Sequence, residues 1–83
     1  MSLRQLTFTR ESTEKSQLEK NVAQAKALIP KPENIIRLKI SSDNNRIEVK
    51  YGGELPNVYE DYEKTIIAAV ESLGYKHEET EWV

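Results

Sequence analysis

The chain has 83 residues and a mass of 9.6 kDa, enough for one hydrophobic core, so we expect a single domain over residues 1–83. Hydrophobic residues at 37% and charged residues at 31%, with three glycines and three prolines, exclude collagen-like, low-complexity and disordered classes. No apolar run approaches a membrane span, and no cysteine is present for a disulfide or a thiolate ligand. With no signal peptide in the first ten residues, these features predict a soluble, cytoplasmic domain.

Charge is divided unevenly along the sequence. Residues 1–50 carry ten Lys and Arg against six Asp and Glu, a net charge of +4, whereas residues 51–83 carry two against eight, a net charge of −6. The two halves either complement each other in space or simply keep a small domain soluble, or else one of them forms a partner surface of one sign.

A short strand is predicted near the start of the chain. Over Leu3–Thr9 the apolar residues Leu6 and Phe8 alternate with polar residues, a period of two that is typical of a half-buried strand. Both apolar side chains are therefore expected to face the core.

An amphipathic helix is predicted next. Ser16 and Glu19 have the spacing of a capping box, although Ser12 or Thr13 could start the helix one turn earlier. Pro30 disfavours helical geometry at the residue before it, so the helix is expected to end there. Four apolar residues recur on one face of this helix: Leu18, Val22, Ala25 and Ile29.

The clearest strand pair is a hairpin. Ile35–Ile40 and Arg46–Tyr51 both alternate apolar with charged residues, and Gly52 with Gly53 is expected to end the second strand in a turn. A two-residue loop at 43–44 would set the register, although a longer loop over 41–45 also fits. The shorter loop pairs Ile40 with Ile47, Leu38 with Val49 and Ile36 with Tyr51, all facing inward.

A second amphipathic helix and a final segment complete the chain. Asn57 is a candidate cap with Glu60 three residues later, and Gly74 can adopt the left-handed conformation that ends a helix. For Tyr75–Val83 an edge strand is favoured over an ordered tail, although no clean apolar face alternates there. The apolar stripe of the helix is Tyr59, Tyr62, Ile66, Ala69, Val70 and Leu73.

The order strand, helix, strand, strand, helix, strand predicts an α+β fold of the ferredoxin-like βαββαβ type. Its antiparallel sheet would have the spatial order four, one, three, two, with both helices on one face. The open face is expected to be mildly basic, wet and without aromatic rings. It would carry Gln5, Thr7, Thr9, Arg37, Lys39, Arg46, Glu48 and Lys50.

Residues with catalytic or metal-binding potential are few. His77 is the only histidine, and its acidic neighbours do not have the spacing of a metal site, so a solvated histidine is the favoured interpretation. The two glycines at 52–53 lack the Lys and Ser or Thr of a phosphate-binding loop. We therefore expect no enzyme, no catalytic residue, no metal and no cofactor.

The acidic C-terminal region is a candidate protein-binding surface. It could meet a basic partner with its tryptophan as an anchor, although that ring could equally close over the end of the core. Edge pairing of the second strand into a homodimer is a further expectation, with Ile35 on the open side beside an inward Ile36. The expected contact residues are Glu78, Glu79, Glu81 and Trp82.

The basic open face is a candidate nucleic-acid surface. RNA-recognition sheets stack bases on aromatic side chains, which this face lacks, so only contacts with phosphates remain. Ordinary solvation of an exposed sheet explains the same residues equally well. The candidate phosphate contacts are Arg37, Lys39, Arg46 and Lys50.

The second half of the sequence resembles a known family. Arg46–Tyr51 together with Ile66–Tyr75 is similar to a strand, a helix and a terminal Gly-Tyr of heavy-metal-associated domains, which are ferredoxin-like copper chaperone modules. The resemblance implies the same fold. Thr9–Thr13 stands where that family has its Met-Thr-Cys-x-x-Cys loop, so the resemblance implies no metal-binding residue here.

The chain also resembles the small DinI family of DNA-damage-response and phage proteins. The shared features are the order strand, helix, hairpin, acidic helix and an acidic end with Trp and an apolar residue, here Glu79–Val83. In that family an acidic helix is implicated in contacts with a recombinase filament. Gly74 interrupts the corresponding element of this chain.

From these features we predict a small non-enzymatic protein-interaction module that binds a macromolecular partner through its acidic C-terminal region or its sheet edge. One alternative is a nucleic-acid-associated regulator, of phage or DNA-damage-response type, that uses the basic sheet face. Another alternative is a small enzyme that depends on His77. No association with a membrane is expected.

Overall fold

The computed structural model describes residues 3–11, 14–33, 35–43, 45–53 and 58–83. The βαββαβ order of its elements confirms the predicted ferredoxin-like α+β fold, and the final segment is a strand. The elements are β1 (Arg4–Thr9), α1 (Lys15–Leu28), β2 (Ile35–Asp43), β3 (Arg46–Gly53), α2 (Val58–Glu71) and β4 (Lys76–Trp82).

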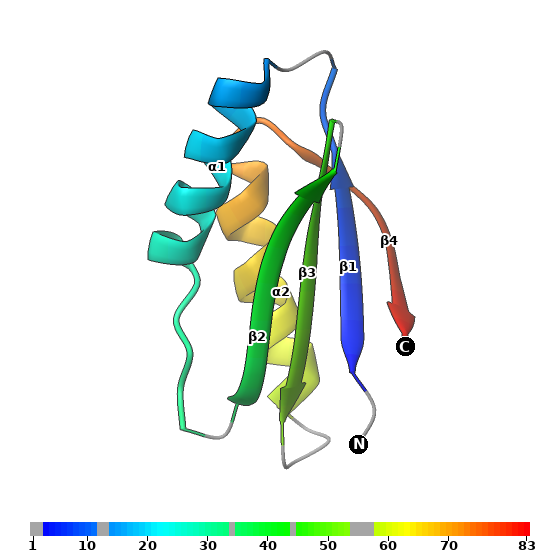
Figure 1. Cartoon of the computed structure of the whole chain (residues 1–83). Coiled ribbons are helices and arrows are strands. Elements are labelled where there is room, and N and C mark those ends of the chain that lie inside the picture. The colour runs from blue at the N-terminus through cyan, green and yellow to red at the C-terminus, as the bar shows by residue number, and fades with distance from the viewer. Residues whose placement is uncertain (1–2, 12–13, 34, 44, 54–57) are drawn as a thin grey trace.

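The four strands form one antiparallel sheet in the order β2-β3-β1-β4, as right-handed crossovers predict. Figure 1 shows α1 and α2 on the same side of this sheet, so its other side has no helix over it. Neither helix, over the residues described, combines the length and the apolar character needed to cross a bilayer.

The hydrophobic core lies between the two helices and the inner face of the sheet. Tyr51 of β3 meets Tyr62 of α2 edge to face, with ring centroids 5.0 Å apart. Because Phe8 and Tyr51 are fully buried, β1 and β3 present no aromatic ring on the open face. The buried apolar residues are Leu6, Phe8, Leu18, Ala25, Ile29, Ile35, Ile40, Ile47, Val49, Tyr51, Tyr62, Ile66, Val70 and Tyr75.

The register of the β2–β3 hairpin differs from the predicted one by two residues. β2 continues to Asp43, which pairs with Arg46, so the strand does not end before a loop at 43–44. A shift of two residues keeps every side chain on the same face, so the hydrophobic pattern could not distinguish the two registers. In place of the expected pairs, Leu38 lies opposite Tyr51, Ile40 opposite Val49 and Ser42 opposite Ile47.

A bulge at the start of β2 reverses the predicted roles of two isoleucines. The register shifts between Ile35, opposite Gly53, and Arg37, opposite Gly52, so one extra residue interrupts the alternation. Ile35 is therefore buried and Ile36 is 40% exposed, the reverse of the expectation. The turn expected at the two glycines is also wrong, because β3 continues through both of them.

The ends of α1 confirm one prediction and correct another. The helix begins at Lys15 after an extended Glu14 that makes no side-chain capping bond, so Ser16 lies inside the first turn and the predicted capping box is wrong. Ile29 is extended ahead of Pro30, as predicted. Some predicted features lie outside the described residues: the caps Ser12, Thr13 and Asn57, and the side chain of Tyr59.

A second bulge explains why the last strand lacked a clear apolar face in the sequence. The register between β1 and β4 shifts between Thr7 and Phe8, which leaves Glu78 as the extra residue of β4. As a result His77 and Thr80, three positions apart, are both half-buried and contact each other. A strict period of two therefore does not describe this strand.

Candidate anion-binding pocket

Basic side chains gather at one end of the open face of the sheet. The register of β2 and β3 sets Lys39 directly opposite Lys50, and Arg37 opposite Gly52 in the next row. Because side chains alternate along a strand, these three basic residues project from the same face. Glu48 lies one row further along β3.

These side chains line a surface pocket of about 370 Å³, which we call the basic pocket. Among the described residues that line it, four are cationic, three are apolar and none is acidic. Leu3, which directly precedes β1, contributes to the lining from the strand on the other side of β3. The lining residues are Leu3, Lys31, Ile36, Arg37, Leu38, Lys39 and Lys50.

No residue in the described part of the chain neutralises the cations of the basic pocket. Within the described parts of the chain, none of its four basic side chains forms a hydrogen bond or an ion pair. Like charges directly opposite each other on neighbouring strands destabilise a sheet, by about 0.2–1 kcal/mol. The pair Lys39 and Lys50 therefore costs stability unless an anion lies between the two ammonium groups.

The loop that brings Lys31 to the pocket is fixed to the second helix. The hydroxyl of Tyr62 donates a hydrogen bond to the carbonyl oxygen of Pro30, next to Lys31, and the amide of Ile35 donates to Pro32 O at 3.0 Å. Burial raises the pKa of the Tyr62 phenol, so its proton stays available for donation at neutral pH.

Arg46, the fourth predicted phosphate contact, does not reach this pocket. It lies at the other end of β3, opposite Asp43 of β2 and Thr9 of β1. The structure therefore brings together three of the four predicted basic residues and adds Lys31, which sequence reasoning missed. No local pattern could have revealed Lys31, because its loop reaches the sheet only through tertiary contacts.

The predicted acidic contact residues lie on β4. Glu78, at the bulge, accepts a hydrogen bond from Thr9 Oγ1 at 2.7 Å. Glu79 and Glu81 are exposed and face the same side as their partners on β1, which are Thr7 and Gln5. Thr7 is only 6% exposed, because strands flank it on both sides, so this part of the face is drier than predicted.

Trp82 is held from the inner side of the sheet. The guanidinium of Arg4 lies 4.8 Å from the centroid of a Trp82 ring, and Arg4 also forms a 3.6 Å ion pair with Glu63 of α2. A cation over an aromatic face is attracted to the ring quadrupole. Trp82 nevertheless remains 55% exposed, so it does not close over the core.

His77 makes structural contacts at the opposite edge of the sheet from the basic pocket. Its ring centroid lies 5.3 Å from that of Phe8, and its Nε2 lies 2.6 Å from Thr80 Oγ1. The described residues contain no group of three side chains suited to hold a metal ion.

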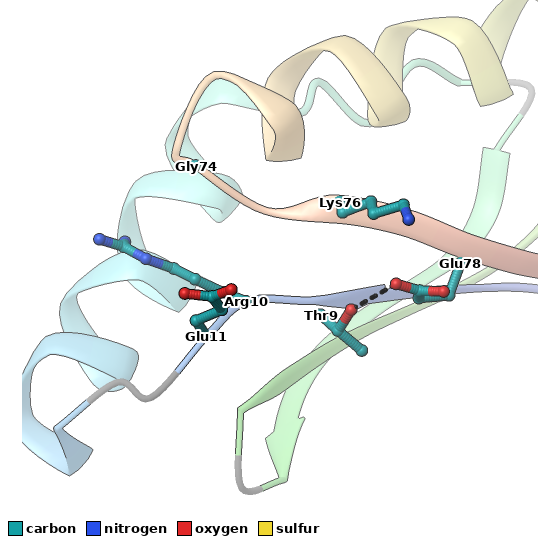
Figure 2. A pocket seen from close by; sticks show the side chains of 6 residues that line it. All are labelled: Thr9, Arg10, Glu11, Gly74, Lys76 and Glu78. Carbon is teal, nitrogen blue, oxygen red and sulfur yellow. Dashed lines mark hydrogen bonds between the residues drawn. The ribbon is translucent and has the colours of Figure 1, made fainter.

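A second pocket lies where β1 meets the turn between α2 and β4 (Figure 2). Arg10 Nη1 donates to Leu73 O at 3.2 Å, and its guanidinium lies 5.9 Å from the Tyr75 ring centroid. Gly74 has a φ of +91°, the left-handed conformation predicted for it. In this pocket the charged groups of Arg10 and Glu78 have hydrogen-bond partners within the protein. We call Thr9, Arg10, Gly74, Tyr75 and Glu78 the Arg10 cluster.

A buried asparagine links this cluster to the first helix. Asn21 is 2% exposed, and its Nδ2 donates to the hydroxyl of Tyr75 at 3.1 Å while its Oδ1 accepts from Gln17 Nε2 at 3.0 Å. The sequence analysis missed this residue, because a polar side chain beside an apolar stripe normally faces solvent.

Comparisons with known proteins show that the chain shares its fold with solved structures, and they assign it to no family. No protein-family model and no curated protein matches the chain. A solved structure described as a "putative antibiotic biosynthesis monooxygenase" from Deinococcus radiodurans has a TM-score of 0.61 at 10% identity, covering 100% of this chain and 90% of that one. The yeast copper transporter domain Ccc2a has a TM-score of 0.46 at 18% identity, covering 96% and 94%.

The first similarity corrects the function predicted from the sequence. A non-enzymatic module that binds a macromolecule through its acidic end or sheet edge is contradicted, because a protein of the same fold is described as an enzyme. At 10% identity the similarity shows the fold alone, and ferredoxin-like domains also occur in proteins that are not enzymes. The similarity to the DinI family and the cytoplasmic location stay predictions.

Proposed function

We propose that this domain binds a small organic anion, with a phosphate or carboxylate group and a short apolar part, in the basic pocket. The observation that carries the proposal is the convergence on one pocket of three apolar side chains and four cations that have no partner in the described ranges. No acid is among the described lining residues. A volume near 370 Å³ falls within the range of small-molecule sites, about 300–1,000 Å³.

The pocket offers distinct contacts to the two parts of such a ligand. The planar guanidinium of Arg37 can donate two parallel hydrogen bonds to one phosphate or carboxylate, while Lys39 and Lys50 act as point charges. An anion between the two lysines also relieves their mutual repulsion. Leu3 and Ile36 can cover the apolar part, since each buried methylene contributes about 0.8 kcal/mol at most.

The fold similarity to the Deinococcus protein supports testing the bound anion as a substrate as well as a ligand. The charge and shape of the pocket, which do not depend on that similarity, select the ligand class. Binding is therefore the first property to measure.

Titration of the 15N-labelled domain with hexyl phosphate, inorganic phosphate and hexanol tests the proposal. We expect hexyl phosphate to shift the amide signals of residues 36–39 and 50–52 and to bind more tightly than inorganic phosphate, with no saturable binding of hexanol. Hexyl phosphate that shifts no signal, or shifts signals scattered over the whole surface, would overturn the proposal.

A charge-matched pair of variants distinguishes binding in the basic pocket from non-specific electrostatic attraction of the ligand to the protein. Lys39→Gln with Lys50→Gln should weaken hexyl phosphate binding by about tenfold, because two partly exposed charges are lost. Lys20→Gln with Lys26→Gln removes the same charge from exposed positions of α1 and should leave binding unchanged. Equal weakening in both variants would contradict a specific site.

A further inference from the structure

The two outer strands of the sheet carry charges of opposite sign. β2 and β4 are the end strands, so within the described residues no strand pairs with the outer edge of either. β2 exposes Arg37 and Lys39 on the open face, and β4 exposes Glu79 and Glu81 there. Unpaired strand edges are templates for pairing with another chain.

Exposed apolar side chains lie on the same two edges. Ile36 of β2 is 40% exposed, and Trp82 of β4 is 55% exposed. Over residues 36–39 of β2 and 79–82 of β4, each edge therefore combines charges of one sign with one large apolar side chain, while Asp43 and Lys76 lie at the other end of these strands. Ile36 and Trp82 are each partly exposed in a single copy, and they could bury each other's exposed surface between two copies.

The strand directions allow these edges to meet. β2 is antiparallel to β3, β3 to β1 and β1 to β4, so β2 and β4 run in opposite directions within one sheet. If one copy lies beside the next in the same orientation, β2 of the first faces β4 of the second as an antiparallel pair. The junction then continues the sheet with the same geometry as its own strand pairs.

We propose that copies of this chain associate head to tail, with β2 of one copy pairing with β4 of the next. In the matching register Arg37 lies opposite Glu81 and Lys39 opposite Glu79, which brings Ile36, the extra residue of the β2 bulge, near Trp82. These pairs end one residue before the bulge at Glu78. Pairing β4 with β4, or β2 with β2, would instead bring like charges together, so the charges select the unlike edges.

Such a contact is heterologous, because two different surfaces meet. Each added copy leaves one β2 edge and one β4 edge free at the ends, so association does not stop at two copies unless a ring closes. The β2 side of this contact uses Ile36, Arg37 and Lys39, which also line the basic pocket, whereas its β4 side lies outside that pocket. Association therefore does not require a bound anion.

A charge-swap experiment read by sedimentation velocity tests the junction. The unmodified chain should form species larger than a monomer whose share grows with concentration and falls with added salt. One variant carries Arg37→Glu with Lys39→Glu, and the other carries Glu79→Lys with Glu81→Lys. Each alone should associate at least about tenfold more weakly, because both of its edges then have the same sign.

Mixing the two variants distinguishes head-to-tail pairing from other contacts. An equimolar mixture should associate again, because each junction in it joins a basic edge to an acidic edge. The control mixture replaces the first variant with a chain that carries Glu79→Lys, Glu81→Lys, Lys20→Glu and Lys26→Glu. This chain has the same new acidic charges on α1 while both of its edges stay basic, so the mixture should not recover. A chain that stays monomeric at every concentration, or equal recovery in both mixtures, would overturn the proposal.

Lys50→Gln separates this inference from the proposed function. Lys50 lies on the inner strand β3, so this change should weaken binding of hexyl phosphate and leave association intact. Loss of association in Lys50→Gln would show that the junction is not the edge contact described.

Discussion

The two pockets at opposite ends of the sheet differ in how their charged groups are used. In the Arg10 cluster, Arg10 donates to a backbone carbonyl and Glu78 accepts from Thr9, so the charges connect β1 to the α2–β4 turn and to β4. In the basic pocket, Lys39 faces Lys50 with no internal partner in the described residues. Charges with internal partners stabilise the fold. Crowded charges without such partners cost stability, which is the reason for proposing that an anion binds between them.

The largest effect is expected where the Arg10 cluster is tied to α1. Asn21→Ala should lower the free energy of unfolding by about 2 kcal/mol, because it leaves the Tyr75 hydroxyl without its donor and opens a gap in a buried site. Urea denaturation measures the change. Gln17→Ala is the control, since it removes only the outer bond to Asn21 and should cost less.

Gly74→Ala should destabilise the same region by about 1–2 kcal/mol. A φ of +91° is strained for a residue with a side chain. An added Cβ would meet the Arg10 guanidinium at 3.6 Å, an ordinary contact, so the backbone and not crowding supplies the cost. Thermal unfolding monitored by circular dichroism measures it. If the double variant with Arg10→Ala regains full stability, crowding would be the cause instead.

Tyr62→Phe tests the anchor of the basic pocket and should cost about 1 kcal/mol at neutral pH, from the lost bond to Pro30. Burial raises the Tyr62 pKa in the folded state, so its contribution is complete below about pH 10 and is lost as pH rises through the folded pKa. The stability difference between the two proteins should therefore shrink above about pH 10 in urea titrations. A difference that grows there would contradict this account.

The smallest effect should have the opposite sign. Lys39→Gln removes one charge of a facing pair and should raise the free energy of unfolding by a few tenths of a kcal/mol at low salt. Arg10→Gln, an equal charge change in the other pocket, should lower it. Urea denaturation of both variants therefore tests directly whether the charges of the two pockets have opposite effects on stability. A loss of stability in both variants would mean that the lysines also support the fold.

The parts of the fold that follow from local patterns were predictable. The inward positions of Leu6, Phe8 and Ile47 follow from a period of two, and the helix end before Pro30 follows from the restriction on the residue preceding a proline. The bulge that exposes Ile36 was not predictable, because one extra residue changes the alternation without any mark in composition.

The candidate site was predictable only in part. Alternation alone places Arg37, Lys39 and Lys50 on the open face, and the structure confirms that placement. It cannot tell which basic residues are neighbours, because a shift of two residues preserves every face and changes every pair. A shared face also does not imply contact, since Arg46 projects from the same face as Lys50 but lies four residues away along β3, at the far end.

The periodicity of the chain was sufficient for the order of the elements, the apolar faces and the division of charge, because each of these depends on residues close together in sequence. Register, bulges and the convergence of Lys31 with Lys39 and Lys50 needed the folded chain. These features depend on which distant segments pack together, here through the bond from Tyr62 to Pro30 and the pairing of β2 with β3. The site most suited to bind a ligand belongs to this second group.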